Sequence, residues 1–501
     1  MSKRETIRST GSVYFENIVL MGAGYLYWVI MSKLTTTEVI GTSSALISLA
    51  AILAVVASFA IPTGLQRFIA KTYLHGKIAD TRTYVKISVV IMTVGIIFSA
   101  LVTVYAYRWI LDTPVQDNLL FLTAILIASI SITNLVRSII VSSLAKTAWL
   151  PLAAGLSTTC KIAIGVALVL MGLGTFGLMV GFLFAPLVTS VILGCVSLRL
   201  LKSESKREVS TRACLTDLVS ASFSTWVPLI VNTIGAHLGT IVVYGSFGPN
   251  RAAVYFIAFS LVAALLTVMS AAYSVSFPVL SAMADGRKRH IWRAIKITLI
   301  LSSPLSMGLF WFSNEVLSVF GQAYAEGGLA LQILLLSVFP TIISTGISTL
   351  MYAYGKYRHV LLIGLAANIP RPLLYIILVP VLENIGAGLS YTLGSFVGFL
   401  IALAISHKVG LKMYWKNIFL IVVTPSLIGM FFKLINVNYI FGIACTIVIS
   451  TLLFWYLKIL NATDMKDSLM IFPDRLSQQI VSFLHVFRNK GKNGTSESNI
   501  G

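Results

Sequence analysis

The chain has 501 residues, of which 57% are hydrophobic and only 11% are charged. A soluble domain of this length cannot bury so much apolar surface, so the composition excludes a soluble protein and indicates a polytopic helical membrane protein. A formal net charge of +20 would suggest nucleic acid as a partner if the chain were soluble. Here the cations follow the predicted membrane topology, and we expect no nucleic-acid partner.

Apolar runs of about 20 residues are long enough to cross a bilayer as helices, and they recur along the whole chain. Parsing them in order gives residues 11–31, 40–63, 84–107, 118–137, 148–171, 176–198, 218–243, 252–275, 295–313, 328–351, 358–380, 386–406, 417–434 and 438–458. We therefore predict an all-α polytopic membrane protein with about fourteen transmembrane helices.

The distribution of Lys and Arg predicts the orientation of these spans. With the N-terminus placed inside, the cations concentrate in the inner segments, and the outer side holds only Lys33, Arg108, Arg251 and Lys433. Because cytoplasmic loops carry the excess of cations, this pattern places both termini in the cytoplasm and the chain in the cytoplasmic membrane. The predicted outer loops are short, which argues against a membrane enzyme with an external catalytic domain.

Two cations lie inside predicted spans. Lys161 is near the middle of the fifth span, and Arg371 is near the middle of the eleventh. A charge at this depth costs at least about 2.5–3.5 kcal/mol, so it normally faces a cavity or a partner. The two positions are 210 residues apart, and so are Lys146 and Lys356. The shared offset predicts two six-helix lobes related by a pseudo-two-fold axis along the membrane normal, followed by two C-terminal helices.

This repeat predicts the domain boundaries. The N-terminal lobe comprises residues 1–200, a cytoplasmic linker follows at 201–216, and the C-terminal lobe comprises 217–407. Two further spans occupy 408–460. Residues 461–501 are predicted to form a cytoplasmic amphipathic segment and a tail of disordered composition.

The buried cations suit an anionic passenger, because Arg can bind a phosphate bidentately while Lys acts as a point charge. The alternative is that each cation pairs with a carboxylate or a helix-end carbonyl and only locks two helices together. Few acidic residues fall in the spans, which favours the passenger. Arg371 also lies in the stretch Asn368–Pro372, where two prolines interrupt the helix hydrogen bonds and free carbonyl groups.

Other polar and aromatic residues near the span ends have more than one interpretation each. Glu16 and Asn17, about one and a half turns into the first span, predict either a coupling site for H+ or Na+, a partner for a buried cation, or a carboxylate that reaches the inner interface. Arg67, at the end of the second span, marks the mouth of an inner cavity or a headgroup contact. Tyr25, Tyr27 and Trp28 form an interfacial aromatic belt or stack on sugars.

Two segments carry a resemblance to a known family. In VIMSKLTTTEVIGTSSALISL a short outer loop ends in a glycine before the second span, and GISTLMYAYGKYRHVLLIG places a Gly-Lys pair at the inner end of the tenth span. On these motifs the chain resembles the multidrug/oligosaccharidyl-lipid/polysaccharide exporter superfamily, most closely its polysaccharide-biosynthesis (Wzx-like) flippases. The resemblance covers about residues 10–460. It implies a two-lobed bundle whose central cavity opens alternately to the two faces and is lined by the seventh span, which carries Asn232 and His237.

The resulting hypothesis is a flippase that moves a polyprenyl-(pyro)phosphate-linked oligosaccharide from the inner to the outer leaflet by alternating access. The alternative is an ion-coupled multidrug exporter of the same superfamily, which would prefer an acidic cavity. We expect lipid-linked oligosaccharide and membrane lipids as partners, H+ or Na+ as candidate coupling ions, and a monomer that contacts a glycan polymerase or glycosyltransferases. No cofactor and no enzymatic activity are expected. The predicted cavity residues are Lys161, Arg371, Arg67, Asn232, His237 and Asn368.

Overall fold

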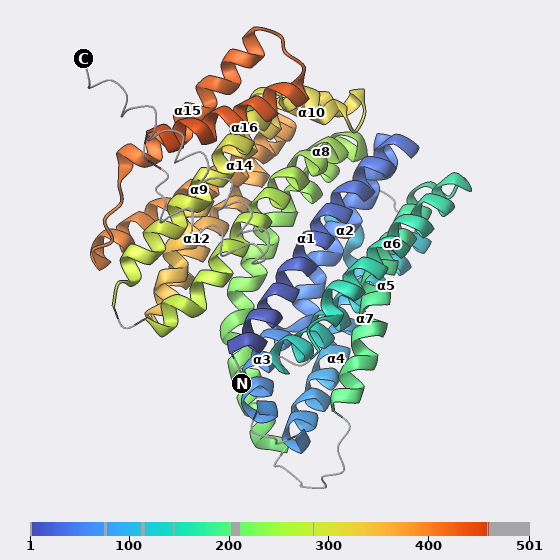
Figure 1. Ribbon diagram of the computed structural model, residues 1–501. Helices are drawn as coiled ribbons and strands as arrows, with labels where there is room; N and C mark the ends of the chain where they lie inside the picture. The colour runs from blue at the N-terminus through green and yellow to red at the C-terminus, as the bar shows by residue number, and fades with distance from the viewer. Residues whose placement is uncertain are drawn as a thin grey trace, which may run out of the picture.

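The computed structural model describes residues 3–74, 78–111, 116–143, 146–201, 211–283, 285–457 and 459, and all regular elements among them are helices (Figure 1). They are α1 (Lys3–Leu34), α2 (Thr37–Ser58), α3 (Ile61–Leu74), α4 (Ile78–Leu111), α5 (Asp117–Ser143), α6 (Trp149–Leu170), α7 (Gly174–Leu200), α8 (Thr211–Ala282), α9 (Arg287–Trp311), α10 (Ser313–Ser318), the 3-10 helix η1 (Gln322–Gly327), α11 (Gly328–Leu336), α12 (Val338–Ala353), α13 (Tyr357–Asn368), α14 (Pro370–Val409), α15 (Trp415–Leu434) and α16 (Tyr439–Tyr456).

Twelve segments of the described chain are long and apolar enough to cross a membrane. Two of them, Leu218–Ser270 and Tyr357–Val409, have 53 residues each. A helix of that length would extend about 80 Å, far more than the roughly 30 Å of hydrocarbon. Each is interrupted by one residue with non-helical backbone, Gly248 in the first and Glu383 in the second. Each therefore supplies two crossings, and the prediction of an all-α membrane protein with about fourteen spans is confirmed.

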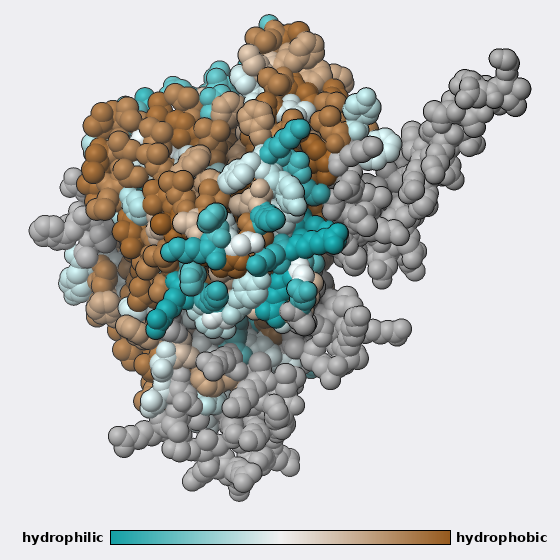
Figure 2. Space-filling view, turned by 90° about the vertical axis from the view of Figure 1, so that its left-hand side faces the viewer, coloured by the Kyte–Doolittle hydropathy of each residue, from teal (hydrophilic) through white to brown (hydrophobic). Residues whose placement is uncertain are grey.

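The helices gather into two groups on either side of α8. Figure 1 shows α1 to α7, coloured blue to teal, on one side and α9 to α16, coloured yellow to red, on the other. Hydrophobic residues cover much of the surface seen in Figure 2, as contact with lipid tails requires. The domain boundaries stay predictions, because most of the linker (202–210) and the C-terminal segment from 460 onward lie outside the described residues.

The predicted repeat is visible in how two helix pairs pack. In the α6–α7 pair, a Cβ added to Gly177 would lie 3.0 Å from Leu168. In the second half, where α14 folds back at Glu383, a Cβ added to Gly386 would lie 2.2 Å from the carbonyl oxygen of Leu378. The two glycines are 209 positions apart and their contacts 210, so the same close packing recurs at the offset predicted from the cations.

A break in the second span frees backbone groups that neighbouring helices then bind. Phe59 and Ala60 both adopt left-handed backbone (φ 49° and 51°), a conformation that costs a non-glycine residue about 1–2 kcal/mol. The turn ends α2, and the carbonyl of Val55 accepts a hydrogen bond of 3.1 Å from the indole N–H of Trp226. The ring of Phe59 lies against the same indole, with 4.3 Å between centroids. The break therefore joins the second span to α8.

Helix α2 contacts the first half of α8 along its whole length. At the start of α2 a Cβ on Gly41 would lie 1.8 Å from the carbonyl oxygen of Pro249, and just past the end of α2 a Cβ on Gly64 would lie 2.4 Å from Ser222 Oγ. Backbones approach this closely only where glycine supplies no side chain. The first group of helices is therefore in contact with α8 at both ends of this interface.

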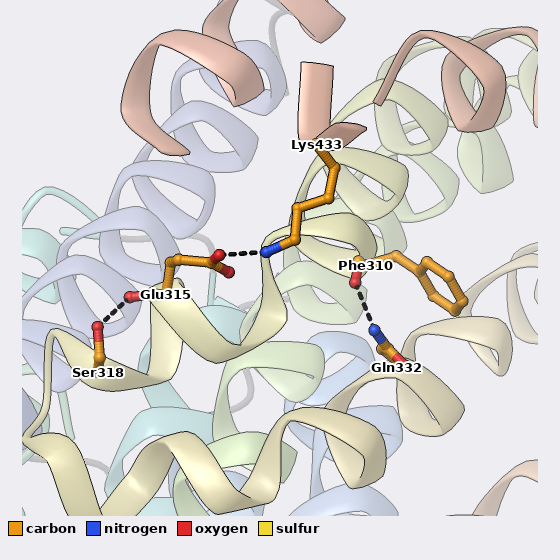
Figure 3. Close-up of polar contacts among 5 residues, drawn as sticks. All are labelled: Phe310, Glu315, Ser318, Gln332 and Lys433. Atoms are coloured by element: carbon orange, nitrogen blue, oxygen red, sulfur yellow. Dashed lines mark hydrogen bonds and ion pairs between the residues drawn. The ribbon is translucent and has the colours of Figure 1, made fainter. Parts of the chain in front are cut away.

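The last two spans dock on the second group of helices (Figure 3). Lys433 of α15 forms an ion pair with Glu315 of α10. Nearby, Gln332 of α11 donates a hydrogen bond of 3.1 Å to the carbonyl of Phe310, which lies in the last turn of α9 and lacks a partner within that helix. Ser318 Oγ donates to the carbonyl of Glu315 at 2.7 Å. These contacts anchor α15 through α10 and α9.

Candidate functional site

A pocket lies between the two groups of helices, where α1 faces the second half of α8. Its volume is about 410 Å³. Along α1 it extends from Asn17 to Trp28, a distance of about 16 Å at 1.5 Å per residue. We call it the central pocket. Its described lining consists of Asn17, Leu20, Met21, Gly24, Tyr25, Trp28, Ile257, Ser260, Leu261, Ala263, Ala264, Thr267 and Phe320.

The lining of the central pocket is mostly apolar, with three aromatic rings and three neutral polar side chains, and carries no charged residue among those described. Tyr25 and Phe320 meet edge to face at 5.5 Å and form one wall. Thr267 also lines a second pocket of about 220 Å³, in which Thr341 has a buried hydroxyl without a described hydrogen-bond partner. Ring faces beside hydroxyl and amide groups suit a ligand with apolar faces and many neutral hydrogen-bonding groups.

Lys161 lies behind the wall of the central pocket. It is buried in α6, with its ammonium nitrogen 4.3 Å from the ring centroid of Tyr27 and 3.9 Å from that of Phe182. No described carboxylate pairs with it. The two ring faces compensate part of the cost of burying the cation. The ring of Tyr27 lies 5.4 Å from that of Trp28, which does line the pocket.

Arg371 occupies the equivalent place in the second group. Its guanidinium donates hydrogen bonds to Asn368 Oδ1 (2.5 Å) and Ser395 Oγ (2.9 Å), and its centre lies 3.9 Å from the ring of Tyr391. Arg371 Nε is buried without a described partner. Tyr391 in turn contacts Phe259, the residue before Ser260 of the pocket lining, with centroids 5.1 Å apart.

The two cations therefore share one arrangement. Phe182 and Tyr391, the rings beside them, are 209 positions apart, and the cations themselves are 210 apart. From each cation a chain of two rings leads to the helices that form the central pocket: Tyr27 and Trp28 on one side, Tyr391 and Phe259 on the other. Neither cation belongs to the described lining, so a direct contact with a passenger stays a prediction.

The ring beside Arg371 offers a test of this arrangement. We expect Tyr391→Leu to lower the stability of the protein by about 2 kcal/mol, because it removes the π face from a desolvated cation. Tyr391→Phe keeps that face and should cost less than about 0.5 kcal/mol. Unfolding in mixed micelles titrated with sodium dodecyl sulfate measures both. Equal losses in the two variants would show that the ring face does not stabilise the guanidinium.

Glu16 has a cationic partner that the sequence analysis did not identify. Arg137 of α5 binds it bidentately, with Nε 2.9 Å from Oε1 and Nη2 2.8 Å from Oε2. The Glu16 side chain is 3% exposed and that of Arg137 32% exposed. Of the readings left open for Glu16, this geometry is that of a partner for a cation. Its neighbour Asn17 lines the central pocket.

The remaining predicted residues lie on the first half of α8, at the end of α13 and on α3. Asn232 is exposed and His237 is partly buried on the first half of α8, and neither belongs to the lining of the central pocket. Asn368 is held by Arg371 and by the carbonyl of Gly364, to which its amide donates at 2.9 Å. The side chain of Arg67 lies outside the described residues.

Sequence reasoning missed two features of this region. Ser260 and Thr267 were not singled out, because hydroxyl residues are common in membrane helices and no local pattern marks those that line a pocket. Phe182 and Tyr391 were not paired with the cations. The 209-residue offset between these two rings was a signal available from the repeat.

Comparison with known proteins assigns the family. The family model described as "Polysaccharide biosynthesis protein" matches residues 30–327, more than half of the chain. The chain therefore belongs to this family of polysaccharide biosynthesis proteins, as its resemblance predicted. No curated protein sequence matches it.

Solved structures share its fold. The chain is similar to the lipid II flippase MurJ in an inward closed conformation, with a TM-score of 0.72 and 16% identity over 91% of this chain and 100% of that one. It is also similar to a multidrug resistance MATE family transporter of the MOP superfamily. The inward-facing form gives a TM-score of 0.58 and 15% identity over 78% of this chain and 97% of that one. The outward-facing form gives 0.54 and 16% over 83% and 100%.

Proposed function

We propose that this multi-pass membrane protein is a flippase that moves a polyprenyl-(pyro)phosphate-linked oligosaccharide between the leaflets of the cytoplasmic membrane, from the inner to the outer one. The observation that supports this most is the central pocket between α1 and α8, which is uncharged and mostly apolar and combines three aromatic rings with three neutral polar side chains. A glycan presents apolar ring faces and many hydroxyl groups, and both find counterparts in this lining. Membership of the polysaccharide biosynthesis family agrees with a glycan as cargo.

The two shielded cations supply the electrostatic part of the proposal. Lys161 lies no more than about 10 Å from the ring of Trp28 by way of Tyr27. At that distance and an effective dielectric constant of about 20, a unit positive charge attracts a unit negative charge by about 1.7 kcal/mol. Arg371 lies at a similar distance from the ring of Phe259, by way of Tyr391. Together they favour an anionic cargo without touching it.

The same charges disfavour a multidrug exporter. A pocket for organic cations needs an acidic lining, and none of the described lining residues is acidic. The nearest candidate is Glu16, next to Asn17, but both of its oxygens are occupied by Arg137. Translocation of a lipid-linked glycan breaks no bond, so the proposal requires no catalytic residue.

The proposal includes alternating access and an orientation with both termini in the cytoplasm. The break at Phe59–Ala60 and the contacts of α2 with α8 supply an interface at which the two groups of helices can separate. The proposal also includes coupling to H+ or Na+ at Glu16 and Asn17. Binding of the ion there would act through the ion pair between Glu16 and Arg137. We further propose that the protein is a monomer and that it contacts a glycan polymerase or glycosyltransferases.

Two glycines of α1 provide a matched test. Gly24 lines the central pocket and Gly22 is exposed outside the described lining, and an added Cβ would meet nothing within 4 Å at either position. Two residues along a helix turn the side chain by about 200°, to the opposite face. We expect Gly24→Trp to lower flipping of a lipid-linked oligosaccharide in proteoliposomes at least tenfold, because the indole fills much of the pocket. Gly22→Trp should change it less than twofold.

Both variants should fold, which a monodisperse gel-filtration peak checks. Equal flipping by Gly24→Trp and the parent protein would exclude the central pocket as the cargo route. Efflux of cationic dyes by the parent protein, with no flipping of lipid-linked glycan, would replace the flippase by the exporter.

A further inference from the structure

A basic face lies at the end of the second group of helices where α9 begins and α14 ends. Figure 2 shows hydrophilic side chains gathered there and bordered by hydrophobic surface. The exposed basic residues described in this region are Lys288, Arg289, His407, Lys408, Lys412 and Lys416. Asp285, the acidic residue described beside them, accepts the N–H of Gly286 at 2.6 Å. The face is therefore strongly cationic.

A pocket of about 640 Å³ opens in this face between the end of α14 and the start of α15. We call it the basic-face pocket. It is separate from the central pocket and shares no lining residue with it. Its described lining consists of Leu403, Ser406, His407, Gly410, Leu411, Lys412, Met413, Tyr414 and Trp415.

The backbone turn that shapes the basic-face pocket depends on Gly410. This residue has left-handed backbone (φ 72°) and caps α14, with its N–H bonded to the carbonyl of His407 at 3.0 Å. The place where a Cβ would stand is 3.4 Å from the ammonium nitrogen of Lys288, which comes from the first turn of α9. Lys288 thus adds a second ammonium group to that of Lys412 in the lining.

The lining divides into a cationic part and an apolar part. Tyr414 and Trp415 are exposed, and Tyr414 packs against Trp292 of α9 with centroids 5.4 Å apart. Aromatic residues of this kind mark the level of the lipid headgroups. The C-terminal end of α14 carries a partial negative charge and the N-terminal end of α15 a partial positive one, and the two oppose each other here. The side chains therefore determine the sign of the electrostatic potential in the pocket.

We infer that the basic-face pocket binds the headgroup of an anionic phospholipid from the leaflet that meets this face. The phosphate would lie between Lys288 and Lys412, and the glycerol and first methylene groups would contact Leu411 and Met413. Basic pockets between membrane helices are recognised by anionic headgroups in this way. A free phosphate would use the cations but leave the apolar part empty, which favours the lipid. The inference does not depend on the proposed function.

The test compares two soluble short-chain lipids bound to the purified full chain. Native mass spectrometry measures the binding of dioctanoyl phosphatidylglycerol and of dioctanoyl phosphatidylcholine. We expect the anionic lipid to bind at least tenfold more tightly. Each lysine near an anionic headgroup contributes about fivefold, so Lys288→Gln with Lys412→Gln should weaken binding of the anionic lipid about twentyfold or more. Replacing both by Arg should preserve it.

A matched control removes two cations from elsewhere on the predicted inner side. Lys86 and Lys356 are exposed and are not part of the basic-face pocket. Their joint replacement by Gln changes the net charge equally and should alter binding less than threefold. The inference is overturned if both lipids bind alike, if the control loses as much as the double variant, or if inorganic phosphate displaces the lipid at the lipid's own concentration.

Discussion

Replacing Arg137 by alanine is expected to destabilise the protein by about 3–5 kcal/mol, because it leaves Glu16 buried without its partner. The carboxylate is 3% exposed and receives two hydrogen bonds from that guanidinium. Removing one member of a buried pair costs more than the pair contributes, since the remaining charge is no longer compensated. Unfolding in mixed micelles titrated with sodium dodecyl sulfate measures the loss.

Replacing Glu16 instead of Arg137 should cost less stability. Arg137 is 32% exposed, so in Glu16→Gln its charge can still be solvated, and the cost should stay near about 1 kcal/mol. The double variant Glu16→Gln/Arg137→Gln should recover most of the loss seen in Arg137→Ala, because no charge is then left buried. Equal losses for Arg137→Ala and Glu16→Gln would show that the pair does not govern stability.

Gly41→Ala is expected to open the interface between α2 and α8 at the start of α2. The added methyl carbon would stand 1.8 Å from the carbonyl oxygen of Pro249, so the two backbones must move apart. Overpacking of this kind costs about 1–3 kcal/mol, which lowers the equilibrium ratio of closed to open contact by about 5- to 150-fold. A disulfide between Thr37→Cys and Asn250→Cys reports that contact, since the native side chains are hydrogen-bonded at 2.6 Å. The yield of this disulfide should fall as the closed contact becomes less populated.

Gly22→Ala is the control for this experiment. It lies on α1 with open space around it, and alanine favours a helix over glycine by about 1 kcal/mol. The same gain applies at Gly41, so a lower crosslinking yield there reflects the clash and not a weaker helix. An unchanged yield would mean that the contact at the start of α2 adapts without opening.

The number and order of the spans were predictable because each crossing needs its own run of apolar residues. The sequence even separated the two crossings within α8, since Gly248 and Pro249 interrupt the apolar pattern where the chain turns. The break at Phe59–Ala60 was not predictable. Neither residue favours left-handed backbone, and the contacts that stabilise it come from Trp226, far away in the sequence.

The site was predictable only in part. A buried cation is conspicuous in an apolar span, so Lys161 and Arg371 were found at once. Which way each side chain points depends on the rotation of its helix against its neighbours, and one sequence does not contain that information. The partner of Glu16 was missed for a related reason: Arg137 stands at the end of a span, where a cation ordinarily signals topology alone.

In each half, two rings lead from the buried cation to the helices of the central pocket, so that different residues recognise the charge and the shape of a cargo. In the proposed flippase, Lys161 and Arg371 sense only that a headgroup is negative, through the rings of Trp28 and Phe259. Among the described lining residues, the outline of the glycan meets α1, α8 and Phe320. A family member can therefore acquire a new sugar specificity by changing these two helices, while the electrostatic preference for a phosphate-linked carrier is inherited unaltered.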